Sequence, residues 1–597
     1  MVMFRSWRER LFGKVDGAVL RSAASTKPSP PPNLPPSKAR AFARAGLVAV
    51  ALATAVPPVM GSPTPAQAQA GATPAPRQCI ALGDLTPRQR DMVDVGLSDA
   101  QRRGEAALPC IWLNPGAPDG DETAICIESP SGQEICVERT ATREARLDLR
   151  GSVIAWSPTA PESWLFEGRT GSIADLPVFL KDNIETADMP TTAGSLALVD
   201  NAPGRDAPLV TRLRNAGAVI LGKANLSEWA NIRSSSSISG WSAVGGQTRN
   251  PYAPERTPCG SSAGSAVAVA IGLAPAAIGT ETDGSITCPA SVNGVVGFKP
   301  TVGLVSRTLI IPISHSQDTA GPIATTVEDA AIVLSVIAGS DPLDPATAEA
   351  DARKVDYRAA LDADSLRGAR IGVLRFLVPN YSAETQAVFE ANLQAMRDAG
   401  AELVEITEAP ADFRQIGGWE IIVLLTELKH DLNLYLASTD PEQVKTRTLA
   451  DVIAFNAAEP RELALFGQDL FERAEASGGL TDPAYVEARE RSFRAAGPEG
   501  IDRMMAEHGV IALTAPTTSR AWTNDPDDDD RSQGSASRLA AVAGYPHLTV
   551  PMGFDRGMPV GISFMAGQWD DATVLSLGYA FEQRTRARRA PTLQTIH

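Results

Sequence analysis

The sequence has few histidines and few cysteines, and it lacks the motifs that usually hold a cofactor. Its five histidines are scattered, no two of its six cysteines stand in a C-x-x-C arrangement, and no phosphate-binding glycine loop is present. We also find no internal repeat. We therefore expect no cofactor and no bound metal, so that any chemistry must come from the chain's own side chains.

A hydrophobic run long enough to span a membrane is missing near the N-terminus, where a shorter one occurs. Residues 45–56 are apolar, but a span takes about 20 residues. Basic residues precede this run, and overlapping A-x-A sites follow it at residues 66–70, which is the order of a secretory signal peptide. No Arg-Arg pair precedes it, which favours a Sec-type route over the twin-arginine route. We expect cleavage near Ala68 or Ala70 and a periplasmic or secreted protein with no stable membrane span; a disordered cytosolic tail is the alternative.

Positive charge is scarce. The chain has 54 Lys and Arg against 70 Asp and Glu, a formal net charge of −16. Residues 1–70 carry +7 of formal charge, so the remainder carries −23. A strongly acidic surface repels phosphate backbones. We therefore expect no nucleic-acid partner and interpret the charge as a contribution to solubility.

The cysteines fall into two groups. Four lie early in the mature chain: Cys79, Cys110, Cys126 and Cys136. An even number in an oxidising compartment indicates two disulfides, for which three pairings are possible. Residues 124–128 and 134–138 alternate like a hairpin, which favours Cys126–Cys136 together with Cys79–Cys110. We interpret Cys259 and Cys288 as small buried side chains rather than nucleophiles.

From about residue 171 the sequence alternates between strand-like and helix-like segments. Apolar runs predict strands at residues 176–181, 218–221, 369–374, 402–406, 510–514, 547–551 and 560–564. Amphipathic segments predict helices at residues 208–216, 385–399 and 571–584, and an earlier helix is predicted at 85–100. Repeated helix–Gly–strand units indicate an α/β fold. We divide the chain into a signal peptide with a long basic n-region (1–70), a segment with a helix and four cysteines (71–145) and one large domain (146–597).

Two turns rich in glycine and serine stand at the centre of that domain. Residues 258–266 read Pro-Cys-Gly-Ser-Ser-Ala-Gly-Ser-Ala, and residues 280–289 read Thr-Glu-Thr-Asp-Gly-Ser-Ile-Thr-Cys-Pro. The small residues between them, 267–277, predict a buried helix. Glycine lets a backbone approach a ligand closely, and packing alone does not require so many hydroxyl groups beside glycines. We therefore expect the active site here.

A serine in these turns needs a base, because its hydroxyl is a poor nucleophile until its proton is removed. No histidine lies in either turn. Lys181 ends the predicted strand 176–181, where burial would lower its pKa, although such a lysine taken alone is more often structural. Residues 260–264 match the G-x-S-x-G nucleophile elbow, with Ser262 as the nucleophile. That motif requires a preceding strand, and three prolines with no apolar run stand there instead, so we reject it.

Several spaced motifs resemble the amidase signature family. They are Lys181-Asp-Asn183, Asn225-Leu-Ser-Glu-Trp229, Gly240-Trp-Ser-Ala243, Gly245-Gly-Gln-Thr-Arg-Asn-Pro-Tyr252, Gly260-Ser-Ser-Ala-Gly-Ser265, the turn 280–289, Gly297-Phe-Lys-Pro-Thr301, Ser316-Gln-Asp-Thr-Ala-Gly-Pro322 and Ala541-Val-Ala-Gly-Tyr-Pro546. The resemblance runs from about residue 171 to the C-terminus, and within the family it is greatest to bacterial peptide amidases, which remove the C-terminal amide of peptides. It implies one large domain with a central, mostly mixed β-sheet covered by helices on both faces.

The resemblance also implies roles for individual residues. Ser285 resembles the nucleophile, Ser261 the bridging serine, whose peptide bond is cis in the family, and Lys181 the base. The oxyanion hole would be formed by the backbone N–H groups of Thr282, Asp283, Gly284 and Ser285. Asp182 and Ser262 are expected to support Lys181 and Ser261.

Some positions depart from the family's pattern or have a structural interpretation. Ala263 and Cys259 stand where glycine is common, which narrows the freedom of the turn without removing a reacting group. Lys223 and Lys299 are interpreted as structural, and Asp318 is expected to fix its turn through bonds to backbone. The four-cysteine segment is expected to staple the N-terminus after export; shaping a substrate entrance is the alternative.

The sequence thus predicts a secreted serine amidohydrolase that acts on linear amides, peptide amides first, through a Ser-Ser-Lys triad and an acyl-enzyme. Three alternatives remain: an amidase of other aliphatic or aryl amides, a component of the machinery that amidates misacylated transfer RNA, and a non-catalytic binding protein on the same fold. Trp229, Trp241 and Trp522 are candidates to line the substrate pocket. The oligomeric state is left open.

Overall fold

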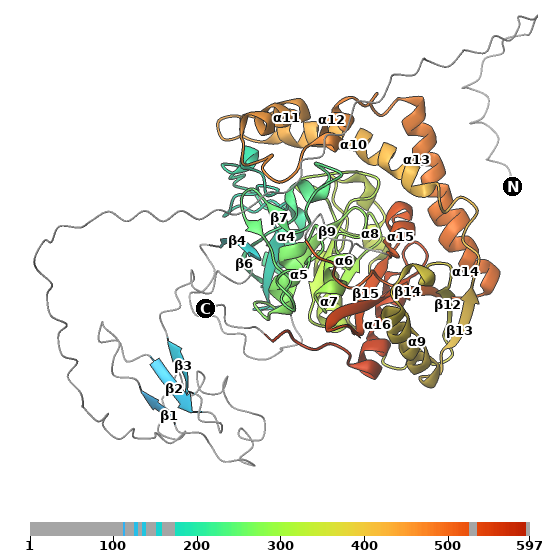
Figure 1. Cartoon of the computed structure of the whole chain (residues 1–597). Coiled ribbons are helices and arrows are strands. Elements are labelled where there is room, and N and C mark those ends of the chain that lie inside the picture. Colours follow the sequence, from blue (N-terminus) through green and yellow to red (C-terminus); the bar gives the residue numbers. More distant parts are fainter. Residues whose placement is uncertain are drawn as a thin grey trace, which may run out of the picture. The chain divides into compact units, whose positions relative to one another are not determined.

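A computed structural model describes residues 151–157, 173–524 and 534–592, together with three strands nearer the N-terminus (Figure 1). The predictions for the signal peptide, the helix 85–100, Cys79 and Cys110 lie outside the described residues. Within the described part, no helix is both long enough and apolar enough to cross a membrane.

One mixed sheet of 11 strands forms the centre of the main domain. Its strands are β4 (Val153–Trp156), β5 (Pro177–Lys181), β6 (Val219–Ala224), β9 (Ala276–Glu281), β10 (Val296–Lys299), β11 (Thr319–Ala324), β12 (Arg370–Leu374), β13 (Glu402–Ile406), β14 (Ala512–Pro516), β15 (His547–Asp555) and β16 (Met558–Met565). They lie in the order β13-β12-β14-β16-β15-β10-β11-β9-β5-β6-β4. β5 is parallel to β6 and β9, and β12 is parallel to β13 and β14, whereas the remaining pairs are antiparallel. The mixed sheet and the predicted strand positions are confirmed, with shifts of one to a few residues at their ends.

The predicted hairpin among the N-terminal cysteines is also confirmed. β2 (Ala124–Glu128) pairs antiparallel with β3 (Glu134–Glu138), and β1 (Ile111–Leu113) pairs with β2. The register places Cys126 directly opposite Cys136. The pairing of the four N-terminal cysteines stays a prediction.

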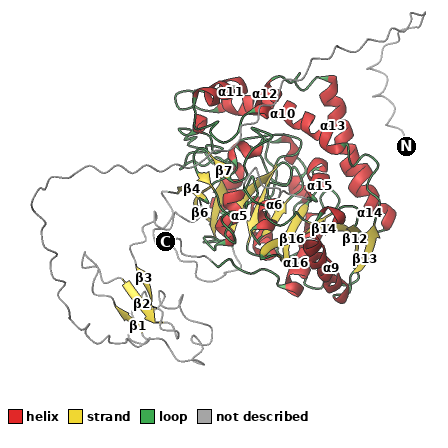
Figure 2. Ribbon diagram, in the orientation of Figure 1, coloured by secondary structure: helices red, strands yellow, loops and turns green. Residues whose placement is uncertain are grey.

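The helices of the main domain are shown in red in Figure 2. They are α4 (Pro208–Asn215), α5 (Ala263–Ala270), α6 (Thr287–Val292), α7 (Val327–Ile337), α8 (Ala350–Arg353), α9 (Ala383–Asp398), α10 (Ile416–Ser438), α11 (Leu449–Ala458), α12 (Asp469–Glu475), α13 (Pro483–Ala496), α14 (Arg503–His508), α15 (Ser537–Ala543) and α16 (Asp571–Thr585). Short 3-10 turns occur at Leu196–Leu198, Glu228–Asn231, Pro345–Thr347 and Val378–Asn380, a π-helical turn occurs at Gly497–Asp502, and β7 (Trp241–Ser242) pairs with β8 (Gly246–Gln247). The predicted helices near residues 208, 385 and 571 are confirmed.

Helices cover both faces of the sheet because its strands are apolar on both sides. In β5, Val178 and Leu180 belong to a buried cluster that includes residues of α4 and α7, whereas Phe179 belongs to a different cluster with residues of α5. Successive side chains of a strand point to opposite faces, so this alternation assigns α4 and α7 to one face and α5 to the other. All three side chains are fully buried.

A separate group of helices, α10 to α13, packs together in one part of the domain (orange in Figure 1). α10 is the longest helix described, with 23 residues, and it contributes Leu428, Leu432 and Leu436 to a buried cluster shared with α12. The spacing of four residues places these leucines on one face of the helix. α10 therefore presents a fixed, buried face to its neighbours.

The predicted helix at residues 267–277 is wrong in its position. The helix α5 begins at Ala263, inside the serine-rich turn, and ends at Ala270. Gly272 then takes a left-handed backbone conformation, with φ +77°, and Ala276–Glu281 forms β9. A short run of small apolar residues fits helix and strand equally well, and the pairing of β9 with β5 and β11 decided between them.

Candidate active site

Lys181 and Thr280 meet at one edge of the sheet because β5 and β9 are parallel. Lys181 is the last residue of β5, and Thr280 is the fifth residue of β9. The carboxyl ends of parallel strands lie at the same edge, where α/β proteins usually bind their ligands. Lys181 Nζ lies 2.8 Å from Thr280 Oγ1, 3.2 Å from the Thr280 carbonyl oxygen and 2.7 Å from Ser261 Oγ. The lysine is fully buried and has three polar contacts.

These three contacts suit a neutral lysine as well as a charged one. Burial lowers the pKa of Lys181, while the negative charges of Asp318 and Glu281 raise it. Burial has the larger effect, and the resulting pKa is about 7. A neutral amine has two N–H donors and one lone pair. The Thr280 carbonyl can only accept, so it takes one N–H, and Thr280 Oγ1 takes the other. The lone pair is then left for the hydroxyl of Ser261, and Lys181 has the geometry and the pKa of a base toward that hydroxyl.

The turn that carries Ser261 is attached to the end of β9. Ser262 Oγ donates to the Thr280 carbonyl at 3.0 Å and accepts from the Thr280 backbone N–H at 3.2 Å. The Gly260–Ser261 peptide bond is cis, as the resemblance implied. A Cβ at Gly260 would lie 2.1 Å from Ser227 Oγ, so only glycine fits there. Ser262 therefore holds Thr280, the residue that in turn contacts Lys181.

The turn that carries Ser285 lies beside the first turn. The carbonyl oxygen of Ser285 accepts a hydrogen bond from the Ser262 backbone N–H at 3.1 Å. Glu281, which is buried, accepts from the backbone N–H groups of Ile286 and Thr287 at 2.8 and 3.0 Å and so fixes the turn from the other side. Gly284 has φ +80°, a conformation that favours glycine.

Several backbone donors in this turn are left without a protein partner. Among the described residues, no hydrogen bond uses the N–H of Asp283, Gly284 or Ser285, and the Ser285 hydroxyl has no hydrogen-bond partner. The Ser285 side chain is 8% exposed. Adjacent unpaired N–H groups beside a serine hydroxyl form an arrangement that can receive a negatively charged oxygen.

Comparison with known proteins identifies the family. The family model described as Amidase matches residues 152–575, which is more than half of the chain. The chain belongs to the amidase family. It is an enzyme that hydrolyses amide C–N bonds, as the sequence predicted.

Relatives of several kinds share this fold. The peptide amidase from Stenotrophomonas maltophilia is 51% identical, with a TM-score of 0.70, over 76% of this chain and 93% of that chain. A probable amidase from Arabidopsis thaliana is 39% identical over 425 residues, which cover 70% of this chain and 78% of that protein. One subunit of the glutamyl-tRNA(Gln) amidotransferase of Roseiflexus castenholzii is 36% identical over 426 residues, 70% of this chain and 84% of that protein.

Two cysteines of this amidase join the two serine-rich turns, which corrects our interpretation of them as simple fillers. Cys259 and Cys288 form a disulfide, with their Cα atoms 6.0 Å apart. Cys259 stands two residues before Ser261, and Cys288 stands three residues after Ser285. A separation of 29 residues between the cysteines gave no sign of the link, because the fold rather than the sequence brings the turns together.

The amidase's other charged residues near the site stabilise the framework. Asp182 accepts hydrogen bonds from the backbone N–H and the hydroxyl of Thr192 and forms an ion pair with Lys223 at 3.6 Å, so it supports the framework without a direct bond to the Lys181 amine. Lys223 also donates to Thr191 Oγ1 at 2.8 Å, in keeping with its structural interpretation. Asp318 accepts from two backbone N–H groups of its own turn, which confirms its predicted role, and also from Thr282 Oγ1 at 2.6 Å.

Sequence reasoning missed the residues that surround the Lys181 amine. Thr280 supplies two of its three contacts, and Asn183 Nδ2 donates to Thr280 Oγ1 at 3.0 Å. Both residues lie in motifs that the resemblance covers, Lys181-Asp-Asn183 and the turn 280–289. The available signal was their position at the ends of two strands, β5 and β9, which becomes informative only once those strands are known to be parallel neighbours.

A cavity of about 490 Å³ opens next to these residues. Asn183, Thr280 and Thr282 form its wall on the side of the two serine-rich turns. Much of the remaining lining is apolar and comes from Leu309, Ile310, Ile311, Pro312, Ile313 and Leu434. The three tryptophans that were candidates for the substrate pocket, Trp229, Trp241 and Trp522, are not among the residues that line this cavity. Trp229 is buried against Phe471, and Trp522 packs in a small cluster with Cys259.

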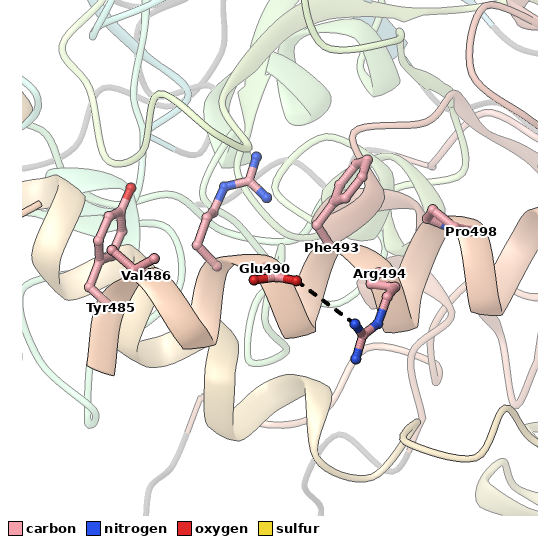
Figure 3. Close-up of a pocket in the computed structure, with 7 residues that line it drawn as sticks. Tyr485, Val486, Glu490, Phe493, Arg494 and Pro498 are labelled. Carbon is pink, nitrogen blue, oxygen red and sulfur yellow. Dashed lines mark ion pairs between the residues drawn. The ribbon is translucent and has the colours of Figure 1, made fainter. Parts of the chain in front are cut away.

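A second hollow, of about 440 Å³, lies along α13 (Figure 3). Its labelled residues all come from α13 and the turn after it, and Glu490 forms an ion pair with Arg494 at 3.8 Å. Tyr485, Val486 and Phe493 make most of its surface apolar. None of its lining residues comes from β5, β9 or the two serine-rich turns, whereas Asn183, Thr280 and Thr282 line the first cavity, so we place the chemistry beside the first cavity.

Proposed function

We propose that this amidase removes the C-terminal amide of peptides by a Ser-Ser-Lys mechanism. The observation that carries the proposal is the contact of 2.7 Å between the buried Lys181 amine, whose pKa lies at about 7, and the hydroxyl of Ser261. Neutral Lys181 accepts the proton of Ser261, and Ser261 accepts that of Ser285 as Ser285 Oγ attacks the amide carbonyl carbon.

The tetrahedral intermediate then loses ammonia. Its oxyanion is stabilised by the backbone N–H groups of Thr282, Asp283, Gly284 and Ser285. The C–N bond breaks as the proton returns from Lys181 through Ser261 to the leaving nitrogen. Water attacks the resulting ester of Ser285 with the same base, and the peptide leaves as a free carboxylic acid.

Two observations favour a peptide amide over other amides. The peptide amidase from Stenotrophomonas maltophilia is 51% identical across nearly its whole length. The cavity beside Thr280 and Thr282 has room for more than a small amide, and its apolar wall suits side chains of a peptide. An amidase of other aliphatic or aryl amides is the alternative, and similarity to the glutamyl-tRNA(Gln) amidotransferase also leaves transfer RNA as a substrate to consider. The formal charge of −16 opposes a nucleic-acid partner.

We further propose that the enzyme acts after export, with residues 1–70 as a Sec-type signal peptide and residues 71–145 as a disulfide-stapled addition to the domain 146–597. The order of basic, apolar and A-x-A segments supports export. The disulfide between Cys259 and Cys288 is compatible with an oxidising compartment.

Ammonia release from three substrates tests the activity: a short peptide amide, a simple aliphatic amide and an aryl acylamide. We expect release mainly from the peptide amide, with kcat/KM lower by about 10²- to 10⁴-fold in Lys181→Ala because the base is lost. Release mainly from another substrate would reject the peptide assignment and keep the mechanism.

Labelling with a serine-reactive fluorophosphonate tests the nucleophile separately. We expect Ser285→Ala to abolish labelling and Ser262→Ala to retain it. The opposite result would restore the nucleophile elbow, and absence of labelling in wild type would reject a reactive serine as the nucleophile.

A further inference from the structure

His315 meets the adjacent residues His430 and Asp431, more than 100 positions later in the sequence, beside the substrate cavity. His315 lies in the loop before β11, and His430 and Asp431 lie on α10. His315 Nδ1 lies 2.8 Å from Asp431 Oδ2, and His430 Nδ1 lies 2.9 Å from Asp431 Oδ1. One nitrogen of each imidazole and one carboxylate oxygen all lie within 4.8 Å of one another. Two imidazoles and a carboxylate are a donor set that zinc-class ions prefer.

The cluster is fixed on the aspartate side and adjustable on the histidine side. The side chain of Asp431 is 11% exposed, and the backbone N–H of His315 donates to its Oδ2 at 2.9 Å. The side chains of His315 and His430 are 44% and 45% exposed. The ligands of a tetrahedral zinc ion lie about 3.4 Å apart. Closing from 4.8 Å to that spacing requires rotation of the two partly exposed rings.

A second carboxylate stands behind His315. Its Nε2 lies 3.4 Å from Glu427 Oε1, and Glu427 is buried and accepts from the Tyr485 hydroxyl at 2.7 Å. A histidine that binds a metal through one nitrogen usually gives its other N–H to such an acceptor, which fixes the ring and raises its basicity. Glu427 occupies this place when His315 binds through Nδ1. The contact between Glu427 and His315 involves neither His430 nor Asp431, so it supports His315 as a ligand independently of them.

Two arginines lie near the cluster, Arg307 and Arg489, the second of which donates to Ser316 Oγ at 2.6 Å. Arg307 donates to the backbone carbonyl of His315 at 2.5 Å, but its guanidinium is paired with Asp344 at 2.7 Å. The carboxylates of Asp431, Glu427 and Asp344 outnumber these two arginines, so the immediate surroundings carry a net negative charge.

We propose that His315, His430 and Asp431 bind one divalent ion of the zinc class at the wall of the substrate cavity. Three protein ligands leave a fourth coordination position for water or for a polar group of a molecule in the cavity. His315 and Asp431 both line this cavity, so a bound ion narrows it and ties the loop before β11 to α10. The same loop carries Asp318, which accepts from Thr282 of the catalytic turn. The ion is thus expected to slow amide hydrolysis rather than to take part in it.

Zinc titration of the purified full chain tests the site without reference to activity. With a chromophoric chelator as competitor, we expect wild type to bind one more Zn²⁺ than the double variant His315→Ala/His430→Ala. We expect the single variant His430→Gln, which loses a ligand, to bind that ion more than tenfold more weakly than wild type. Glu427→Gln keeps all three ligands, and we expect it to lower the zinc affinity by about tenfold. His508→Gln, a histidine of α14, is the matched control and should bind like wild type.

Cobalt substitution separates this site from the N-terminal cysteines. A Co²⁺ complex of nitrogen and oxygen ligands shows visible ligand-field bands without the intense sulfur-to-cobalt charge-transfer band of a thiolate site. We expect such a spectrum in wild type and its loss in His315→Ala/His430→Ala, with thermal unfolding unchanged in the absence of metal. Equal zinc stoichiometry in wild type and the double variant would overturn the proposal and leave a hydrogen-bonded His–Asp–His cluster.

Turnover supplies the final readout. We expect micromolar Zn²⁺ to inhibit amide hydrolysis by wild type and by His508→Gln, to inhibit His430→Gln much less, and to be reversed by a chelator. Equal inhibition of all three proteins would show that zinc acts elsewhere and would reject the proposed effect on turnover. Because the binding experiments need no substrate, they stand whether or not peptide amides prove to be the substrate.

Discussion

At the scale of single residues, the site depends on what surrounds the Lys181 amine. A lysine in water is charged at neutral pH and cannot accept a proton. Complete burial removes the water that stabilises the ammonium, and the nearby carboxylates of Asp318 and Glu281 only partly compensate for that loss. The contacts with Thr280 and Ser261 satisfy the buried amine in either protonation state.

The pH dependence of hydrolysis should follow the protonation of Lys181. Because its pKa is lowered from 10.5 to about 7, the amine is neutral, and able to act as a base, above about pH 7 and charged below it. We therefore expect kcat/KM to fall as the pH drops through about 7 and to be level above it. Initial rates measured across this range at low substrate concentration check this prediction. If kcat/KM instead fell as the pH dropped through about 10, burial would not have lowered the pKa of Lys181.

Thr280 should position Lys181 without reacting itself. Thr280→Val removes the hydroxyl that accepts from both Lys181 and Asn183. We expect kcat to fall about tenfold to hundredfold because the amine loses its orientation, and the acidic limb to move to lower pH because an acceptor that stabilises the ammonium is gone. Thr280→Ser keeps a hydroxyl, so we expect its kcat and the pH of its acidic limb to lie close to the wild-type values. An unchanged pH profile in the valine variant would mean that the hydroxyl has no influence on Lys181.

At the scale of elements, two turns and two strand ends have to meet. β5 and β9 bring Lys181 and Thr280 to one edge, the start of α5 brings Ser261, and the turn before α6 brings Ser285. Glycines permit the close approach, and hydrogen bonds from Ser262 connect the pieces. The Cys259–Cys288 disulfide adds a covalent link between the same two turns.

Removing this disulfide should destabilise the fold. The link closes a loop of 29 residues, which in the chain-entropy account is worth about 3 to 4 kcal/mol. We expect Cys259→Ala/Cys288→Ala to unfold at lower urea concentration than wild type. Reductant should lower the urea midpoint of wild type toward that of the variant. Any change that reductant causes in the variant itself would come from the N-terminal cysteines. Identical unfolding curves without reductant would show that the link is dispensable.

At the scale of the whole molecule, the large sheet contains everything that the site needs. All the residues that we place in the mechanism lie between Lys181 and Ser285, in the central strands and the turns between them. The later strands β12 to β16 extend the same sheet, and α10 provides part of the cavity wall through Asp431, Leu434 and Tyr435.

The N-terminal segment should therefore be dispensable for catalysis. We expect a shortened chain that begins at residue 146 to fold and to retain kcat/KM for a peptide amide within about threefold, since the family match begins only at residue 152. Expression of this chain beside the full chain, with the same assay and thermal unfolding, checks the boundary. A folded but inactive product would point to the entrance-shaping alternative for residues 71–145, and an unfolded product would place the boundary elsewhere.

The sequence alone determined the class of fold and the candidate triad. Short apolar runs between glycines predicted strands such as β5, β13 and β16 because buried strands have that local signature. The resemblance of the spaced motifs to the amidase signature family implied Lys181, Ser261 and Ser285, whereas Lys181 taken alone has the pattern of a structural lysine. The same local reasoning failed at residues 267–277, where small apolar residues fit a helix and a strand alike.

Only the tertiary structure decided which distant residues meet. Thr280 contacts Lys181 across 99 residues, and Asp431 contacts His315 across 116, while 29 residues separate the disulfide partners. No local propensity encodes such contacts, because they follow from the pairing of strands and the packing of α10 against a loop. The pKa of Lys181 is decided at the same level, since it depends on how completely the folded domain removes water from the amine.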